Sequence, residues 1–158
     1  ALEELGLENI GLFATFASFT GWVARPFLGS LLDKKGPKAT LIPAGISFSA
    51  GLLCLAMAQN LAMFCIAGIL IGFGQNGISP VLMAISMRTV PEERKAAGNS
   101  TNYLGMDIGS AVAATAGGFM VSAFGYRLGF AAFIVPVMLA TVVAAWYLGR
   151  LDKKEKAK

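Results

Sequence analysis

Five long apolar stretches, separated by short polar connections, constrain this sequence more than any other feature. They cover residues 9–32, 39–58, 61–87, 97–123 and 128–149. Each is close to or above the ~20 residues with which a helix crosses a hydrocarbon layer ~30 Å thick. Lipid offers no hydrogen bonds to a bare backbone, so single segments of this kind must be helical. We therefore predict an all-α, polytopic transmembrane bundle of five spans, followed by a cytoplasmic tail at residues 150–158.

The composition agrees with a chain whose surface mostly avoids water. Apolar residues make up 56% and charged residues 14% of the sequence, whereas a soluble domain carries about 25% charged residues. Histidine is absent, and Cys54 and Cys65 both lie inside apolar stretches. Without histidine, a cysteine pair or a nucleophile beside a base, the sequence predicts no enzyme, no catalytic residue, no metal site and no cofactor.

Basic residues gather on one side of the predicted spans. Eleven of the 13 lysines and arginines fall there: Lys34, Lys35, Lys38, Arg88, Arg94, Lys95, Arg150, Lys153, Lys154, Lys156 and Lys158. The opening segment instead carries Glu3, Glu4 and Glu8. The positive-inside rule then places the N-terminus outside and the C-terminus in the cytoplasm. The basic tail follows Trp146 and Tyr147 and has no interleaved aromatic residues, so it predicts contact with anionic lipid rather than nucleic acid.

Polar groups inside the spans are the candidate functional residues. Asp107 lies in the fourth span, and Ser100, Tyr103, Ser110 and Ala114 share its face. The third span holds Gln75, Asn76 and Ser79, and the first holds Arg25. Such groups are costly in a membrane. One interpretation is a water-accessible path for substrate or protons, with Asp107 as the proton- or cation-binding group. The alternatives are a structural Arg25–Asp107 pair, or an Arg25 side chain that extends toward the cytoplasmic surface.

Glycines spaced four residues apart predict close helix packing. Gly68 and Gly72 form such a pair in the third span, and Gly105 and Gly109 form one in the fourth. Where lipid removes the hydrophobic drive between helices, small residues let the backbones approach each other.

The connection between the first two spans holds the most specific motif. It runs Gly-Ser-Leu-Leu-Asp-Lys-Lys-Gly-Pro-Lys over residues 29–38. This segment resembles the signature loop of the major facilitator superfamily, G-x-L-x-D-[RK]-x-G-x-[RK], although Pro37 stands where the family often has a basic residue. The resemblance implies a cytoplasmic gating loop formed by Gly29, Asp33, Lys34, Gly36 and Lys38, with Arg88 as the partner of Asp33.

The resemblance extends over the whole chain and implies its function. The segments Val90–Arg94, Asn99–Thr101, Leu104–Gly109 and Gly125–Arg127 resemble the last part of the family's C-terminal half, with spans equivalent to its eighth to twelfth helices. The resemblance implies a fragment of a transporter that works by alternating access. Within the family we expect a proton-coupled exporter of small organic molecules in a bacterial inner membrane, and sugars, organic anions and metal chelates stay open as substrates. The partners of this chain would be the bilayer, the missing N-terminal half, the substrate and protons. The alternative is a membrane sensor that transports nothing, or a half-size subunit that must dimerise.

Overall fold

The computed structural model describes residues 10–155, and the side chains of residues 11–88 and 90–150. Within this range every regular element is a helix. The helices are α2 (Ile10–Lys35), α3 (Pro37–Ala56), α4 (Leu61–Thr89), the short 3-10 helix η1 (Glu92–Arg94), α5 (Lys95–Ala132) and α6 (Ile134–Glu155). The predicted all-α bundle is confirmed.

Each of the five predicted stretches overlaps one long helix. By length and hydropathy, three helical stretches of the described chain could cross a membrane: Pro37–Ala56, Leu61–Arg88 and Glu92–Arg150. The last stretch has 59 residues and contains α5 and α6 as far as Arg150. The helix α2 is not among these stretches: its 26 residues are long enough, but Arg25 and several small polar residues make it less apolar.

Two glycines make the sharp turns that separate the helices. Gly36, between α2 and α3, has φ 81° and ψ 173°. Gly125, which interrupts α5, has φ 76° and ψ 165°. Residues with a Cβ rarely adopt this backbone conformation. The next residue after Gly36 is Pro37 at the first position of α3, where the missing N–H costs nothing. The predicted fifth span therefore begins in the short helix 126–132 and continues, after Phe133, as α6.

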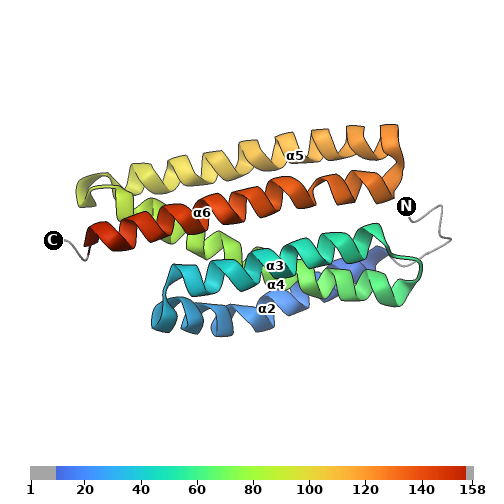
Figure 1. The fold of residues 1–158 in the computed structure, drawn as a ribbon, viewed down its shortest axis with the longest axis horizontal. Coiled ribbons are helices and arrows are strands. Elements are labelled where there is room, and N and C mark those ends of the chain that lie inside the picture. Colours follow the sequence, from blue (N-terminus) through green and yellow to red (C-terminus); the bar gives the residue numbers. More distant parts are fainter. Residues whose placement is uncertain (1–9, 156–158) are drawn as a thin grey trace.

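Helices that follow each other along the chain run in opposite directions between the two ends of the bundle (Figure 1). The helices α2, α3 and α4 form a packed unit, and α6 packs mainly against α3. The turn after α2, the η1 segment and the end of α6 lie at one end, while the start of α2 lies at the other (Figure 1). The basic connections predicted to share a side of the membrane thus share an end of the bundle.

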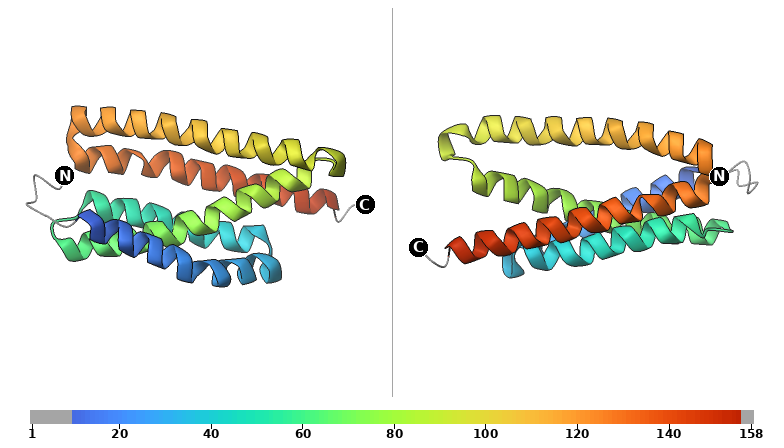
Figure 2. Two further views of the ribbon diagram at one scale, coloured as in Figure 1. Left: turned by 180° about the vertical axis from the view of Figure 1, so that it is seen from behind. Right: turned by 45° about the horizontal axis from the view of Figure 1, so that its top comes forward.

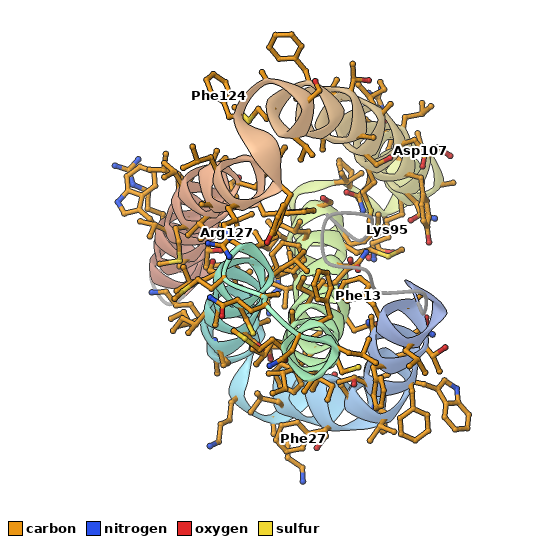
Figure 3. The ribbon with its side chains drawn as sticks, turned by 90° about the vertical axis from the view of Figure 1, so that its right-hand side faces the viewer. Phe13, Phe27, Lys95, Asp107, Phe124 and Arg127 are labelled. Atoms are coloured by element: carbon orange, nitrogen blue, oxygen red, sulfur yellow. The ribbon has the colours of Figure 1, made fainter. Side chains whose placement is uncertain are left out.

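The core is thin, and much of the apolar surface faces outward. One buried cluster joins Leu41, Val81 and Leu148 of three helices. Large apolar side chains such as Phe27 and Phe124 are both 63% exposed, and they point away from the bundle (Figure 3). In water such a surface would aggregate, whereas in a bilayer it is the lipid-facing surface.

The helix α5 is the least embedded part of the fold. It lies along the edge of the bundle beside α6 and diverges from α4 beyond the η1 turn (Figure 2). Every side chain from Tyr103 to Ala116 is exposed. The short helix after Gly125 differs, because Tyr126 and Gly129 are buried and the Tyr126 hydroxyl donates to the carbonyl of Ala58, 3.4 Å away.

Candidate functional site

The contact between α2 and α4 positions the candidate site. A Cβ placed on Gly68 would lie 3.0 Å from the carbonyl oxygen of Phe13, and one on Gly72 would lie 2.3 Å from that of Ala17. Successive contacts are four residues apart on both helices, so the helices run parallel and meet along matching faces. The predicted packing role of Gly68 and Gly72 is confirmed.

One turn beyond the Gly72 contact, the matching faces of α2 and α4 bring Arg25 and Asn76 together as a polar pair. Gly21 on α2 faces Asn76 on α4 so closely that a Cβ on Gly21 would lie 2.3 Å from Asn76 Nδ2. One turn further, Arg25 Nε donates to Asn76 Oδ1 at 3.0 Å. Asn76 Nδ2 in turn donates to the carbonyl oxygen of Gly72 at 2.8 Å. This second bond fixes the amide so that its oxygen faces Arg25.

A groove opens beside this pair where the glycine contact ends. Its volume is about 410 Å³, and both helices contribute to its wall. The lining residues are Ala17, Ser18, Gly21, Trp22, Arg25, Gly72, Gln75, Asn76 and Ser79. None of them is acidic, so Arg25 gives the groove a positive charge.

The groove lies deep in the span. Asn76 is 15 residues from the start of α4 at Leu61, which corresponds to about 22 Å of helix. Arg25 is ten residues before the end of α2 at Lys35, or about 15 Å from it. Its side chain crosses to α4 instead of extending along α2 toward the basic end of the bundle. The predicted path residues Arg25, Gln75, Asn76 and Ser79 are therefore neighbours.

Asp107 and Tyr103 lie apart from this groove. Both are exposed on α5, and Tyr103 is 52% exposed. Asp107 projects from the flank of α5 (Figure 3), and Ser110 donates to its backbone carbonyl at 2.9 Å. The proposed structural pair with Arg25 is not formed, since Arg25 bonds Asn76 instead and Asp107 has no ion pair with any described residue. The helices α2 and α5 do not pack together, which explains the difference.

The predicted gating loop lies at the basic end of the bundle. Asp33 is exposed near the end of α2 and has no hydrogen bond or ion pair among the described side chains. Gly36 forms the turn, and Arg88 lies in the last turn of α4. Lys38 extends to α6, where a Cβ on Gly149 would lie 2.8 Å from its Nζ atom. The structure thus does not join Asp33 to Arg88, and Gly29 and Lys34 remain predictions as parts of a gate.

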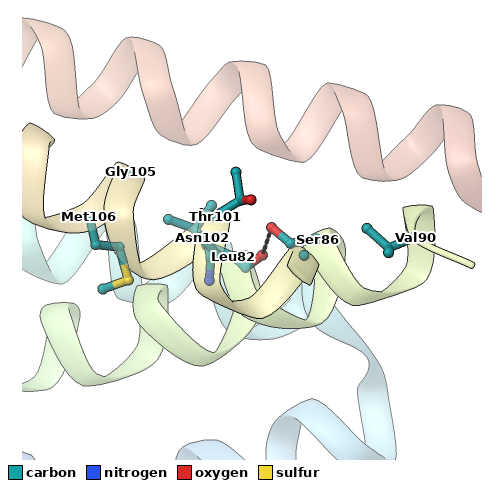
Figure 4. Close-up of a pocket in the computed structure, with 8 residues that line it drawn as sticks. Leu82, Ser86, Val90, Thr101, Asn102, Gly105 and Met106 are labelled. Atoms are coloured by element: carbon teal, nitrogen blue, oxygen red, sulfur yellow. Dashed lines mark hydrogen bonds between the residues drawn. The ribbon is translucent and has the colours of Figure 1, made fainter. Parts of the chain in front are cut away.

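A second cavity, of about 640 Å³, lies between the basic ends of α4 and α5 (Figure 4). Leu82, Val90 and Met106 line it, together with the amide of Asn102. The Ser86 hydroxyl points to its own helix and donates to the carbonyl of Leu82 at 3.0 Å (Figure 4). No charged residue lines this cavity, so it offers less chemical selectivity than the groove.

Four residues that line the groove were not singled out from the sequence: Ala17, Ser18, Gly21 and Trp22. Gly21 lies four residues before Arg25 on the same helical face, and this spacing could have identified it. Within residues 10–155, no group of three or more His, Cys, Asp or Glu residues could hold a metal ion.

The chain is similar in sequence to known proteins. Over 133 residues, the chain is 28% identical to the multidrug resistance protein MdtG of Klebsiella pneumoniae, covering 80% of this chain and 32% of that protein. It is also 26% identical over 141 residues to the multidrug resistance protein fnx1 of Schizosaccharomyces pombe, covering 89% of this chain and 26% of that protein. The chain thus spans about a third or less of the length of these relatives.

A solved structure shares the fold. The peptide transporter POT, as an E310Q mutant in complex with alafosfalin, matches 90% of this chain and 29% of its own with a TM-score of 0.71 and 24% sequence identity. The family model of the Major Facilitator Superfamily matches residues 2–158. The chain belongs to the major facilitator superfamily.

Proposed function

We propose that this chain forms five helices of one half of a secondary active transporter, a proton-coupled exporter of small organic molecules. The observation that carries the proposal is the polar groove of Arg25 and Asn76, which lies where α2 and α4 meet closely at Gly68 and Gly72. Such a groove halfway along apolar helices offers a solute binding groups that lipid lacks. The related proteins named for multidrug resistance support export of organic compounds.

The remaining helices would complete the cavity. Because the chain spans about a third of the length of its relatives, we infer that it belongs to a larger transporter whose other half closes the second wall. We assign it to the C-terminal half, with the N-terminus outside and the C-terminus in the cytoplasm of a bacterial cell. The gathering of Lys34, Lys38 and Arg88 at one end of the bundle supports this orientation.

Asp107 is the candidate proton carrier. It is the acidic group within the long apolar part of α5, and every residue from Tyr103 to Ala116 is exposed. A carboxylate facing a cavity between the two halves could be protonated from one side of the membrane and deprotonated from the other. Asp33 and the loop around Gly36 would close the cytoplasmic side in one state.

Proteoliposomes test the transport function. The complete protein containing this chain would be reconstituted, and efflux of ethidium and of fluorescein would be followed with and without an imposed proton gradient. We expect the gradient to drive at least one dye through the wild-type protein, and Asp107→Asn to abolish that coupling while the protein remains folded. Folded protein that moves neither dye under any gradient would oppose the proposal and favour a sensor.

A further inference from the structure

We propose that the groove beside Arg25 and Asn76 binds the anionic group of the solute, so that the substrate class is small organic anions with a flat apolar body. This inference rests on the proposed transport function and adds a charge preference to it. The wall of the groove supplies one permanent positive charge and no acidic group.

The guanidinium of Arg25 has unused binding capacity. Arginine carries five N–H donors and stays protonated at any physiological pH. One donor, at Nε, is used on Asn76, and the side chain has no other hydrogen bond or ion pair among the described residues. A charge at this depth of a membrane is costly unless an anion or several acceptors meet it. A carboxylate matches the two parallel donors of a guanidinium.

Asn76 holds the guanidinium in position for such a ligand. Its Nδ2 atom is fixed on the carbonyl of Gly72 at 2.8 Å, and Gly21 presses against the same amide. With its oxygen in this orientation, Asn76 accepts the hydrogen bond from Arg25 Nε and leaves the Nη donors of Arg25 without a bond to it. The arginine is thereby held before a ligand arrives, which reduces the entropy lost on binding.

The rest of the wall suits the body of the ligand. The indole of Trp22, 74% exposed, lines the groove and offers a flat apolar surface for stacking. Gln75 and Ser79 add neutral hydrogen-bonding groups. The volume of about 410 Å³ lies within the roughly 300–1,000 Å³ of small-molecule sites.

Three probes with the same ring system test the charge preference directly. The purified complete protein would be titrated at neutral pH with 2-naphthoate, 2-naphthamide and 2-naphthylmethylamine, which are anionic, neutral and cationic. Hydrogen bonds to charged groups are worth about 1.5–3 kcal/mol, so we expect 2-naphthoate to bind about 10- to 150-fold more tightly than 2-naphthamide. The amine should bind most weakly. This comparison needs no mutant, so it does not depend on a variant folding.

Substitutions then assign the preference to the groove. Arg25→Gln should remove most of the advantage of 2-naphthoate and leave the affinity for 2-naphthamide unchanged. Arg25→Lys should keep part of it, because an ammonium keeps the charge but loses the paired donors. The matched control is Arg150→Gln, which removes an exposed arginine that stacks on Trp146, and it should change neither affinity.

The outcomes separate the charge preference from the transport function. Four outcomes would each overturn the inference. The first three are equal affinities for the three probes, a preference for the amine, and undetectable 2-naphthoate binding. The fourth is an Arg25→Gln protein that keeps the full preference for 2-naphthoate. Undetectable binding would also be the result if an acidic group elsewhere in the complete protein occupies Arg25. Charge-selective binding that needs Arg25, in a protein that moves no solute, would support the anion site and refute the transport function alone.

Discussion

Replacing Gly72 with alanine should push α2 away from α4. The added Cβ would lie 2.3 Å from the carbonyl oxygen of Ala17, 3.0 Å from its carbonyl carbon and 3.1 Å from its Cα. Non-bonded atoms attract only at separations of roughly 3.5 Å and above, so the α2 backbone must shift by about 1 Å. A side chain could rotate away from such a clash, but backbone atoms of a helix move only with the helix.

The cost follows from what that shift disturbs. Overpacking a well-packed contact costs about 1–3 kcal/mol. The shift would also reach the Arg25–Asn76 hydrogen bond, since Asn76 is the next residue along the same face of α4. For a domain of 150–250 residues, each kcal/mol lowers Tm by about 2–4 °C. We therefore expect Gly72→Ala to lower the Tm by a few degrees, toward the lower end for a longer transporter.

Thermal unfolding of the purified complete protein in detergent measures this loss. Gly11→Ala is the matched control, because Gly11 lies on α2, the helix that Gly72 contacts, and has no atom within 4 Å of an added Cβ. Its Tm should stay within about 1 °C of the wild type, as expected for a substitution that meets no neighbour. A Gly72→Ala protein as stable as the wild type, or an equal loss at Gly11, would refute the proposed contact.

Three further substitutions test other parts of the structure. Gly36→Ala should cost about 1–3 kcal/mol, because φ 81° and ψ 173° strain any residue with a Cβ; an unchanged Tm would contradict this turn. Tyr126→Phe removes the hydroxyl that donates to the Ala58 carbonyl at 3.4 Å and accepts from Arg127 Nε at 3.2 Å, and it should cost about 1–3 kcal/mol in thermal unfolding; an unchanged Tm would contradict these two bonds. Asp107→Asn should leave Tm unchanged, since Asp107 is exposed and has no ion pair in the described chain, while it abolishes proton-driven efflux; unchanged efflux would exclude Asp107 as the coupling group.

The helices were predictable because long apolar stretches between short polar connections form helices in a membrane protein. The predicted stretch 39–58 corresponds to α3 at Pro37–Ala56, and 61–87 corresponds to α4 at Leu61–Thr89. The interruption at Gly125 was also predicted, because the short polar connection between the stretches 97–123 and 128–149 contains it. Hydropathy could not show its conformation, a single positive φ at Gly125 followed by a short helix before α6.

The site was only partly predictable, because its members depend on helix register. Arg25, Gln75, Asn76 and Ser79 were selected as polar residues within apolar spans, and the structure places them around one groove. Asp107 was selected by the same criterion, yet it lies on α5, away from α2. Polar character identifies candidates, but which candidates meet depends on contacts between helices far apart in sequence.

The two glycine pairs show what such contacts add. Gly68 and Gly72 have the same spacing as Gly105 and Gly109, but the first pair presses on the α2 backbone while the second has no neighbour within 4 Å of an added Cβ. The first pair brings α4 close enough to α2 for Asn76 to hold Arg25. The second leaves α5 with a surface of small residues around Asp107. The glycine face of α4 thus builds the groove, and the glycine face of α5 is open for the half of the transporter that we propose completes the cavity.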